Sequence, residues 1–178
     1  EIDLPDDVDP YAPVVYQQGR KNLDRMITEG ILVEWSHADG AVVAITTSSQ
    51  LTKDGKAVML RGCARQARDR FPDLPQILGE QLLNHGRHVF DLGRRIISFP
   101  VEVDPYRNPE LEIIEESCRE LVELVEYKGW CKVVVPRPGC GGGGLEWPLV
   151  RPVLQRYFDE RFYVITMQET DDAKCQNR

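Results

Sequence analysis

The chain has 178 residues, 42% of them hydrophobic, which is the size and composition of a single globular domain with its own core. Its formal net charge is −7 and its pI is about 5.0, which argues against general nucleic-acid binding, because that function usually needs a basic face. No segment is apolar enough to cross a bilayer, and the five cysteines show no zinc-like pairing, so we expect a cytoplasmic, monomeric protein without membrane contact or a metal site.

The chain divides into three parts. Residues 1–29 are predicted to form an acidic N-terminal arm and a short helix over residues 17–29. Residues 30–167 form the predicted domain, and residues 168–178 form a polar tail.

Strands and helices alternate along the domain. In chain order we expect strands at 31–35 and 41–45, helices at 57–70 and 74–84, paired strands at 88–92 and 96–100, a helix at 110–128, a strand at 133–135, a helix at 147–158 and a strand at 162–166. The run Val133 to Val135 is wholly apolar, as in a sheet that helices cover on both faces. The pattern predicts a three-layer α/β/α domain.

Two polar loops follow predicted strands. Residues 46–61 follow one strand, and residues 136–145, with five glycines in the six positions 139–144, follow another. Glycines let backbone N–H groups approach a ligand closely, and a following helix adds its positive N-terminal end. The sequence therefore predicts a phosphate or pyrophosphate site, with a flexible surface loop as the alternative.

These loops carry a family resemblance. The matching segments are residues 41–49 with 55–67, residues 96–101, and the glycine loop through Trp147 with residues 159–165. On these segments the chain resembles the macro domain family of ADP-ribose-binding modules, in its bacterial and phage-like branch, which is similar to the glutamate-ADP-ribose hydrolases. The resemblance implies a mixed sheet between helices, with both phosphates held between two backbone loops and the distal ribose near Thr46, Thr47 and Ser48.

Carried onto this chain, the implied donors are backbone amides of residues 57–62 and 139–145. The expected ligand-binding residues are Thr46, Thr47, Ser48, Lys56, Ala57, Val58, Arg61, Gly62, Phe99, Pro138, Gly139, Cys140, Gly141, Gly142, Gly143, Gly144 and Leu145. A surface ion pair is the favoured alternative for Arg61 and for Arg137, which could each add a charge-assisted contact. Lys53 and Lys56 could steer an anion into the site.

The chain departs from the family pattern at three places. Ile31 stands where the family has an aspartate that accepts from the adenine amino group. Glu102 stands where the hydrolase-like branch has a lysine, and Gly142 and Gly143 stand where it has an acid. Both chemical groups of that mechanism are missing, so the enzyme question stays open, with Glu102 and Asp54 as the catalytic candidates.

Three side chains near the loops have two interpretations each. Cys140 could be an activated nucleophile, but we favour a small residue tucked under the loop. Phe99 could stack on a base or ribose, or pack within the sheet. Trp147 could line the pocket, although packing of the last helix is favoured. The histidines show no metal-ligand spacing.

The sequence therefore predicts binding of ADP-ribose or a related NAD-derived nucleotide, with ADP-ribose or an ADP-ribosylated macromolecule as the partner and no cofactor. An ADP-ribosyl hydrolase or an ADP-ribose phosphate-processing enzyme is the first alternative. An interaction scaffold that binds no nucleotide is the second.

Overall fold

The computed structural model describes residues 41–104, 106–140 and 144–165. The expected helix at 17–29, the expected strand at 31–35 and the polar tail lie outside these residues. The described strands are β1 (Val42–Thr47), β2 (Phe90–Asp91), β3 (Ile96–Pro100), β4 (Val133–Pro136) and β5 (Phe162–Ile165). The described helices are α3 (Gly62–Arg70), α4 (Leu74–His85), α5 (Leu111–Lys128) and α6 (Trp147–Tyr157).

The five strands form one mixed sheet in the order β2-β3-β1-β4-β5. Strand β1 lies at its centre and pairs in parallel with β3 and with β4, while β4 pairs in parallel with β5. Among the described strands, only β2, at one end of this order, runs antiparallel to its neighbour. The carboxyl ends of the four parallel strands therefore lie at one edge of the sheet.

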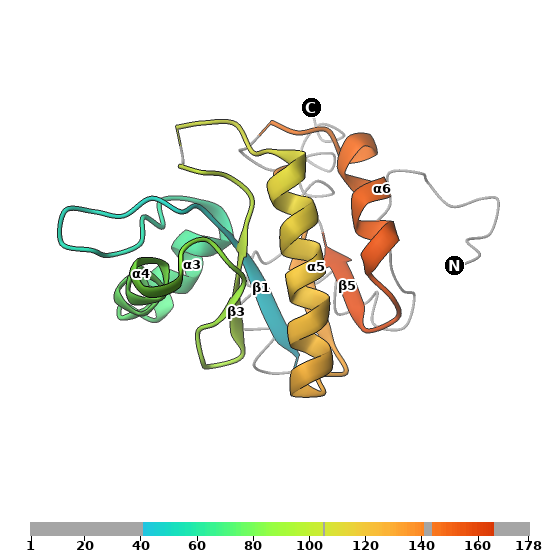
Figure 1. Ribbon diagram of the computed structural model, residues 1–178, viewed down its shortest axis with the longest axis horizontal. Coiled ribbons are helices and arrows are strands. Elements are labelled where there is room, and N and C mark those ends of the chain that lie inside the picture. The colour runs from blue at the N-terminus through green and yellow to red at the C-terminus, as the bar shows by residue number, and fades with distance from the viewer. Residues whose placement is uncertain (1–40, 105, 141–143, 166–178) are drawn as a thin grey trace, which may run out of the picture.

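Helices cover both faces of the sheet (Figure 1), with α3 and α4 on one face and α5 and α6 on the other. Alternate residues of β1 divide between the two faces: Val42 and Ala44 pack in the core under α5 and α6, and Val43 and Ile45 pack under α3 and α4. The two-residue period of a strand produces this division. The predicted three-layer α/β/α fold is confirmed.

The helix predicted at 57–70 begins only at Gly62, so the prediction was wrong for its first five residues. Residues 57–61 instead continue a turn in which Leu51 pairs with Ala57 as an isolated antiparallel bridge. The Ala57 N–H donates to Pro75 O at 2.8 Å and the Val58 N–H to Gln50 O at 3.0 Å. These tertiary acceptors outweigh the helical spacing of the apolar side chains in this segment.

The ends of the other described helices and strands differ from the predicted ends by smaller amounts. Strand β1 extends to Thr47, two residues beyond its predicted end, because it pairs with β3 as far as Pro100. Strand β2 is shorter than predicted, although its antiparallel pairing with β3 around Gly93 and Arg94 was expected. Arg94 is held in its left-handed turn conformation by a two-point ion pair with Asp73, at 2.7 Å for both bonds.

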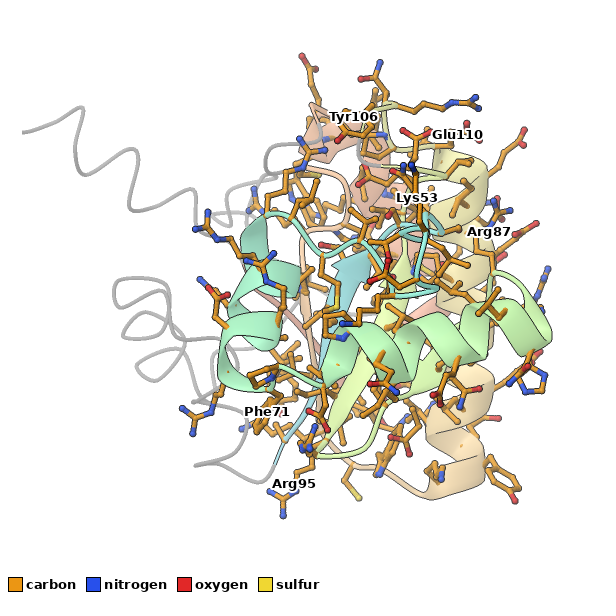
Figure 2. The ribbon with its side chains drawn as sticks, turned by 90° about the vertical axis from the view of Figure 1, so that its left-hand side faces the viewer. Lys53, Phe71, Arg87, Arg95, Tyr106 and Glu110 are labelled. Atoms are coloured by element: carbon orange, nitrogen blue, oxygen red, sulfur yellow. The ribbon has the colours of Figure 1, made fainter. Side chains whose placement is uncertain are left out.

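The turn at residues 51–57 rests on α4 at Gly79. A Cβ at position 79 would overlap Gly55 O and would lie 2.9 Å from Lys56 Cα and 3.0 Å from Ala57 N. Figure 2 shows Lys53 of this turn toward the same end of the molecule as Tyr106 and Glu110, opposite Arg95, which directly precedes β3. The absence of a side chain at Gly79 thus places the first polar loop.

We expect Gly79→Ala to destabilise the protein. Alanine at an exposed helical site would stabilise it by about 1 kcal/mol relative to glycine. Here the methyl group meets backbone atoms, and overpacking of this kind costs about 1–3 kcal/mol. Urea denaturation measures the change, with Glu80→Ala, an exposed neighbour on the same helix, as the control. A gain in stability for Gly79→Ala would show that the loop does not rest on this residue.

Candidate functional site

The site begins where β1 and β4 lie side by side. The chain leaves β1 toward α3 on one face of the sheet and leaves β4 toward α6 on the other. Neighbouring parallel strands whose connections depart to opposite faces leave a crevice beyond their carboxyl ends, and ligands of α/β proteins collect there. The two polar loops predicted from sequence start at this point.

The start of α3 is fixed to the end of β1 by a thiol contact. The Thr46 N–H donates to Cys63 Sγ at 3.4 Å, and Thr46 Oγ1 lies 3.4 Å from the same sulfur. Burial raises the pKa of the Cys63 thiol, with hydrogen bonds from Thr46 acting in the opposite direction. The first-turn N–H groups of α3, which have no acceptor within the helix, therefore lie beside the carboxyl end of β1.

Two amides expected to bind phosphate already have acceptors. Because Ala57 and Val58 donate to Pro75 O and Gln50 O, the first loop offers at most the amides between Met59 and the first turn of α3. Gly62 has a positive φ of 60°, and no atom of the described residues lies within 4 Å of the place of a Cβ, so these residues leave the turn open to a ligand. The predicted phosphate loop thus shifts toward the helix.

The hydroxyl groups of Thr47, Ser48 and Ser49 form a hydroxyl cluster at the end of β1. Thr47 and Ser48 are only 4% and 5% exposed. Thr47 Oγ1, Ser48 Oγ, Ser49 Oγ and Gln50 Oε1 are buried and have no hydrogen-bond partner among the residues that the structure describes. Buried polar atoms nearly always have a partner in folded proteins, so four consecutive exceptions indicate a place where a ligand or water completes the bonding.

The segment after β3 runs alongside this cluster. The Val101 N–H donates to Thr47 O and the Ser49 N–H donates to Val103 O, both at 3.0 Å, so the pairing of the two chains continues past the sheet. This pairing brings Glu102 next to the hydroxyl cluster, with a carboxylate only 11% exposed and 3.6 Å from the guanidinium of Arg61. Burial raises the pKa of the Glu102 carboxyl, Arg61 lowers it and Asp104 raises it further.

The two catalytic candidates therefore differ in environment. Glu102 is buried beside the hydroxyl cluster, whereas Asp54 lies in the exposed turn that rests on α4. Lys53 and Lys56 are exposed on that same turn. Arg61 makes the ion pair that the sequence analysis favoured, but its partner lies inside the site.

The second loop turns at Gly139. Its φ of 73° is in the left-handed region, and a Cβ there would lie 2.8 Å from Leu145 Cδ1 and 3.0 Å from Pro109 Cβ. The Leu145 N–H donates to Gly139 O at 3.0 Å and closes the loop, while the Cys140 N–H donates to Arg137 O at 3.3 Å. The expected ligand residues Gly141, Gly142 and Gly143 lie outside the described residues.

Arg137 lies inside the protein. It is 9% exposed, and its guanidinium carbon lies 4.5 Å from the centre of the Trp147 ring, which is itself buried. Arg137 is therefore not the surface residue that the sequence analysis favoured, and its contact with Trp147 connects the end of β4 to the start of α6. Trp147 packs the last helix against the sheet, as favoured, and its indole Nε1 has no partner among the described residues.

Two further interpretations are decided by burial. Cys140 Sγ donates to Pro138 O at 3.5 Å, and burial raises the pKa of this thiol to about 11, against the opposing charge of Arg137. The Cys140 thiol is therefore neutral and packs under the loop, as the sequence analysis favoured, and it is not an activated nucleophile. Phe99 is fully buried in the core under α5 and α6. It packs within the sheet, and its predicted contact with the ligand was wrong.

The sequence analysis did not single out Ser49, Gln50 or the indole of Trp147 as polar groups of the site. Ser49 and Gln50 belong to the predicted polar loop and directly follow Ser48, so extending the set of expected ligand residues by two positions would have found them. Within the described ranges no group of three His, Cys, Asp or Glu side chains could hold a metal ion, and no described helix is long and apolar enough to cross a membrane.

The comparisons with known proteins point to one fold. No family model matches the chain. The macrodomain of Thermus aquaticus DarG is similar at 26% identity with a TM-score of 0.58, over 70% of this chain and 87% of that one. The macrodomain of Mycobacterium tuberculosis DarG is similar at 23% identity with a TM-score of 0.57, over 69% of this chain and 86% of that one. Thermosipho africanus DarTG in complex with ADP-ribose is similar at 22% identity with a TM-score of 0.58, over 70% of this chain and 37% of that one. The described residues have the macrodomain fold.

A curated relative matches part of the chain. It is a DNA ADP-ribosyl transferase–DNA ADP-ribosyl glycohydrolase fusion protein of Thermosipho africanus (strain H17ap60334), 35% identical over 78 residues, or 43% of this chain. The chain spans 20% of that relative and 37% of the solved DarTG chain.

The macrodomain's glycine loop offers a matched pair of substitutions. Gly139→Ala and Gly144→Ala both place a side chain at positive φ, but among the described residues only position 139 has atoms within 4 Å of the new methyl group. We expect Gly144→Ala to cost about 1–2 kcal/mol of backbone strain, and Gly139→Ala to cost about 1–3 kcal/mol more through overpacking. Thermal and urea unfolding of both variants measure the difference. Equal costs would contradict the close packing of Gly139 on Leu145 and Pro109.

Proposed function

We propose that this macrodomain binds ADP-ribose, or a closely related NAD-derived nucleotide, in the crevice beyond the carboxyl ends of β1 and β4. The observation that carries the proposal is a row of buried polar atoms at Thr47, Ser48, Ser49 and Gln50 that have no partner among the described residues. The row lies at the point where the connections of β1 and β4 diverge. The structural similarity to a DarTG protein described in complex with ADP-ribose supports the same ligand class.

The ligand's parts match the groups around the crevice. A ribose offers hydroxyl groups that can donate to and accept from the hydroxyl cluster after β1. A diphosphate suits unpaired amides at a helix start and in a glycine loop, so the first turn of α3 and the loop closed between Gly139 and Leu145 are the proposed phosphate-binding elements. The proposed ligand residues are accordingly Thr46, Thr47, Ser48, Arg61, Gly62 and the loop 138–145.

The hydroxyl and amide groups of the proposed site should bind the nucleotide with moderate affinity. Hydrogen bonds to charged groups contribute about 1.5–3 kcal/mol each, and several such bonds, after ordering costs, correspond to micromolar affinity of about −8 kcal/mol. The proposed partner is ADP-ribose itself or a macromolecule that carries it. The absence of general nucleic-acid binding, the monomeric state and the cytoplasmic location stay predictions.

We expect calorimetric titration to give a Kd for ADP-ribose at least about tenfold below those for AMP, ATP and NAD, a difference of about 1.4 kcal/mol. Thr47→Val should weaken ADP-ribose binding by a similar factor, since it replaces the hydroxyl with a methyl group. The same change should stabilise the ligand-free protein, because the buried hydroxyl has no partner among the described residues.

Ser98→Ala is the control, since Ser98 is buried in β3 and accepts from the Phe90 N–H, away from the crevice. It should lower stability and leave affinity unchanged. No heat with ADP-ribose would favour the interaction-scaffold alternative, and unchanged affinity in Thr47→Val would remove the hydroxyl cluster from the binding site.

A hydrolase is the second candidate function. It is favoured by the curated relative, whose name includes a DNA ADP-ribosyl glycohydrolase, and by the buried carboxyl of Glu102 beside the proposed ribose site. A carboxyl with a raised pKa can act as a general base or acid near neutral pH. Asp54, on its exposed turn, is the weaker candidate.

If the macrodomain is a hydrolase, it should release ADP-ribose from ADP-ribosylated DNA, and Glu102→Gln should lower kcat by about 10²–10⁴-fold, the usual contribution of acid–base catalysis. Release followed by mass spectrometry measures the rate. Glu110→Gln, an exposed carboxyl at the start of α5, is the control. Tight binding of ADP-ribose without any release would assign the domain to the binding modules.

A further inference from the structure

A charged pair connects the start of α3 to the segment that follows β3. Arg61 is the residue that precedes α3, and Glu102 lies two residues past the end of β3. Arg61 Nη2 and Glu102 Oε2 are 3.6 Å apart, with the arginine side chain 50% exposed and the glutamate side chain 11% exposed. The pair therefore joins the proposed phosphate-binding helix start to a carboxylate inside the site.

A carboxylate at this place opposes the binding of an anion. Of the charged groups near Glu102, Arg61 faces it from the start of α3, and Asp104 faces it from its own loop with the same charge. The neighbouring residues of β1 and its extension, Thr47 and Ser48, are uncharged. An incoming diphosphate would add negative charge beside Glu102 and would compete for the same guanidinium.

Resting on the proposed function, we propose that the diphosphate replaces Glu102 as the partner of Arg61, and that Glu102 then takes up a proton from solvent. The guanidinium keeps its charge and exchanges one oxyanion for another, for which its planar donor fork is suited. The neutral carboxyl left behind can donate to a ribose hydroxyl or to Thr47 or Ser48. The Arg61–Glu102 pair is thus an element that makes nucleotide binding depend on pH.

The direction of the dependence follows from linkage. In the free protein Arg61 holds the pKa of Glu102 down against the effect of burial. In the complex the arginine is withdrawn and an anion lies nearby, so the pKa of the carboxyl is higher than in the free protein. Affinity then rises as pH falls between the two pKa values, by at most about tenfold per pH unit, and is constant outside that window.

The experiment is calorimetric titration of the full chain with ADP-ribose from about pH 5.5 to 8.5 in buffers of different ionisation enthalpy. The linkage predicts uptake of up to about one proton and a Kd that falls with falling pH. Glu102→Gln, which imitates the protonated carboxyl, should bind without proton uptake and more tightly than wild type at alkaline pH. Arg61→Ala should bind more weakly at every pH, and Arg61→Lys should recover part of the affinity.

Glu110→Gln is the matched control, because it removes one exposed carboxylate at the same edge of the sheet and should keep the wild-type slope (Figure 2). Circular dichroism confirms that each variant is folded. The pKa of Glu102, followed by NMR in the free protein and in the complex, should rise on binding.

Two results would overturn the inference. If wild-type protein binds ADP-ribose with a pH-independent Kd and no proton uptake, the exchange of partners does not occur, although the proposed function stands. If Glu102→Gln binds more weakly than wild type at alkaline pH, the carboxylate is itself a ligand group rather than a competitor. Absence of binding at every pH would remove the proposed function together with the inference.

Discussion

The parallel pairing of β1 with both of its neighbours is the constraint on which the site depends. Residues Val43 to Thr47 pair with Ile96 to Pro100 on one side, and Val42 and Val43 pair with Val133 and Val134 on the other. The chain leaves β1 toward α3 in one helix layer and leaves β4 toward α6 in the other. In α/β sheets this arrangement gives a crevice beyond the carboxyl ends of the two strands, independent of any ligand.

Polar groups in the crevice are held by contacts that belong to the fold. Thr46 anchors the start of α3 through Cys63, Thr47 and Ser49 continue the pairing to the segment after β3, and Gly79 gives the first loop its place on α4. The contacts of Thr47 and Ser49 use their backbone groups and leave their side-chain hydroxyls without partners among the described residues. A folded scaffold therefore bears the cost of buried polar atoms, which is the usual condition of a preformed binding site.

The hydrophobic pattern predicted most of the layers correctly. The long amphipathic helix α5, the apolar strand β4 and the glycine loop before α6 were evident because each depends on local spacing and on residues adjacent in the chain. Residues 57–61 were wrongly predicted to be helical, because their apolar side chains fit the 3.6-residue period of a helix as well as the two-residue period of a strand. Their N–H acceptors, Pro75 O and Gln50 O, could not be found from local spacing.

The sequence by itself determined the fold class, the two polar loops and the family they resemble, because glycine runs and alternating apolar residues act over short distances along the chain. Only the tertiary structure decided that Arg137 stacks on Trp147 inside the protein, that Phe99 is closed off in the core, and that Glu102 meets Arg61. Each of these outcomes depends on burial or on contacts between residues that lie apart in the sequence. Such interactions are set by strand order and register, which no local pattern specifies.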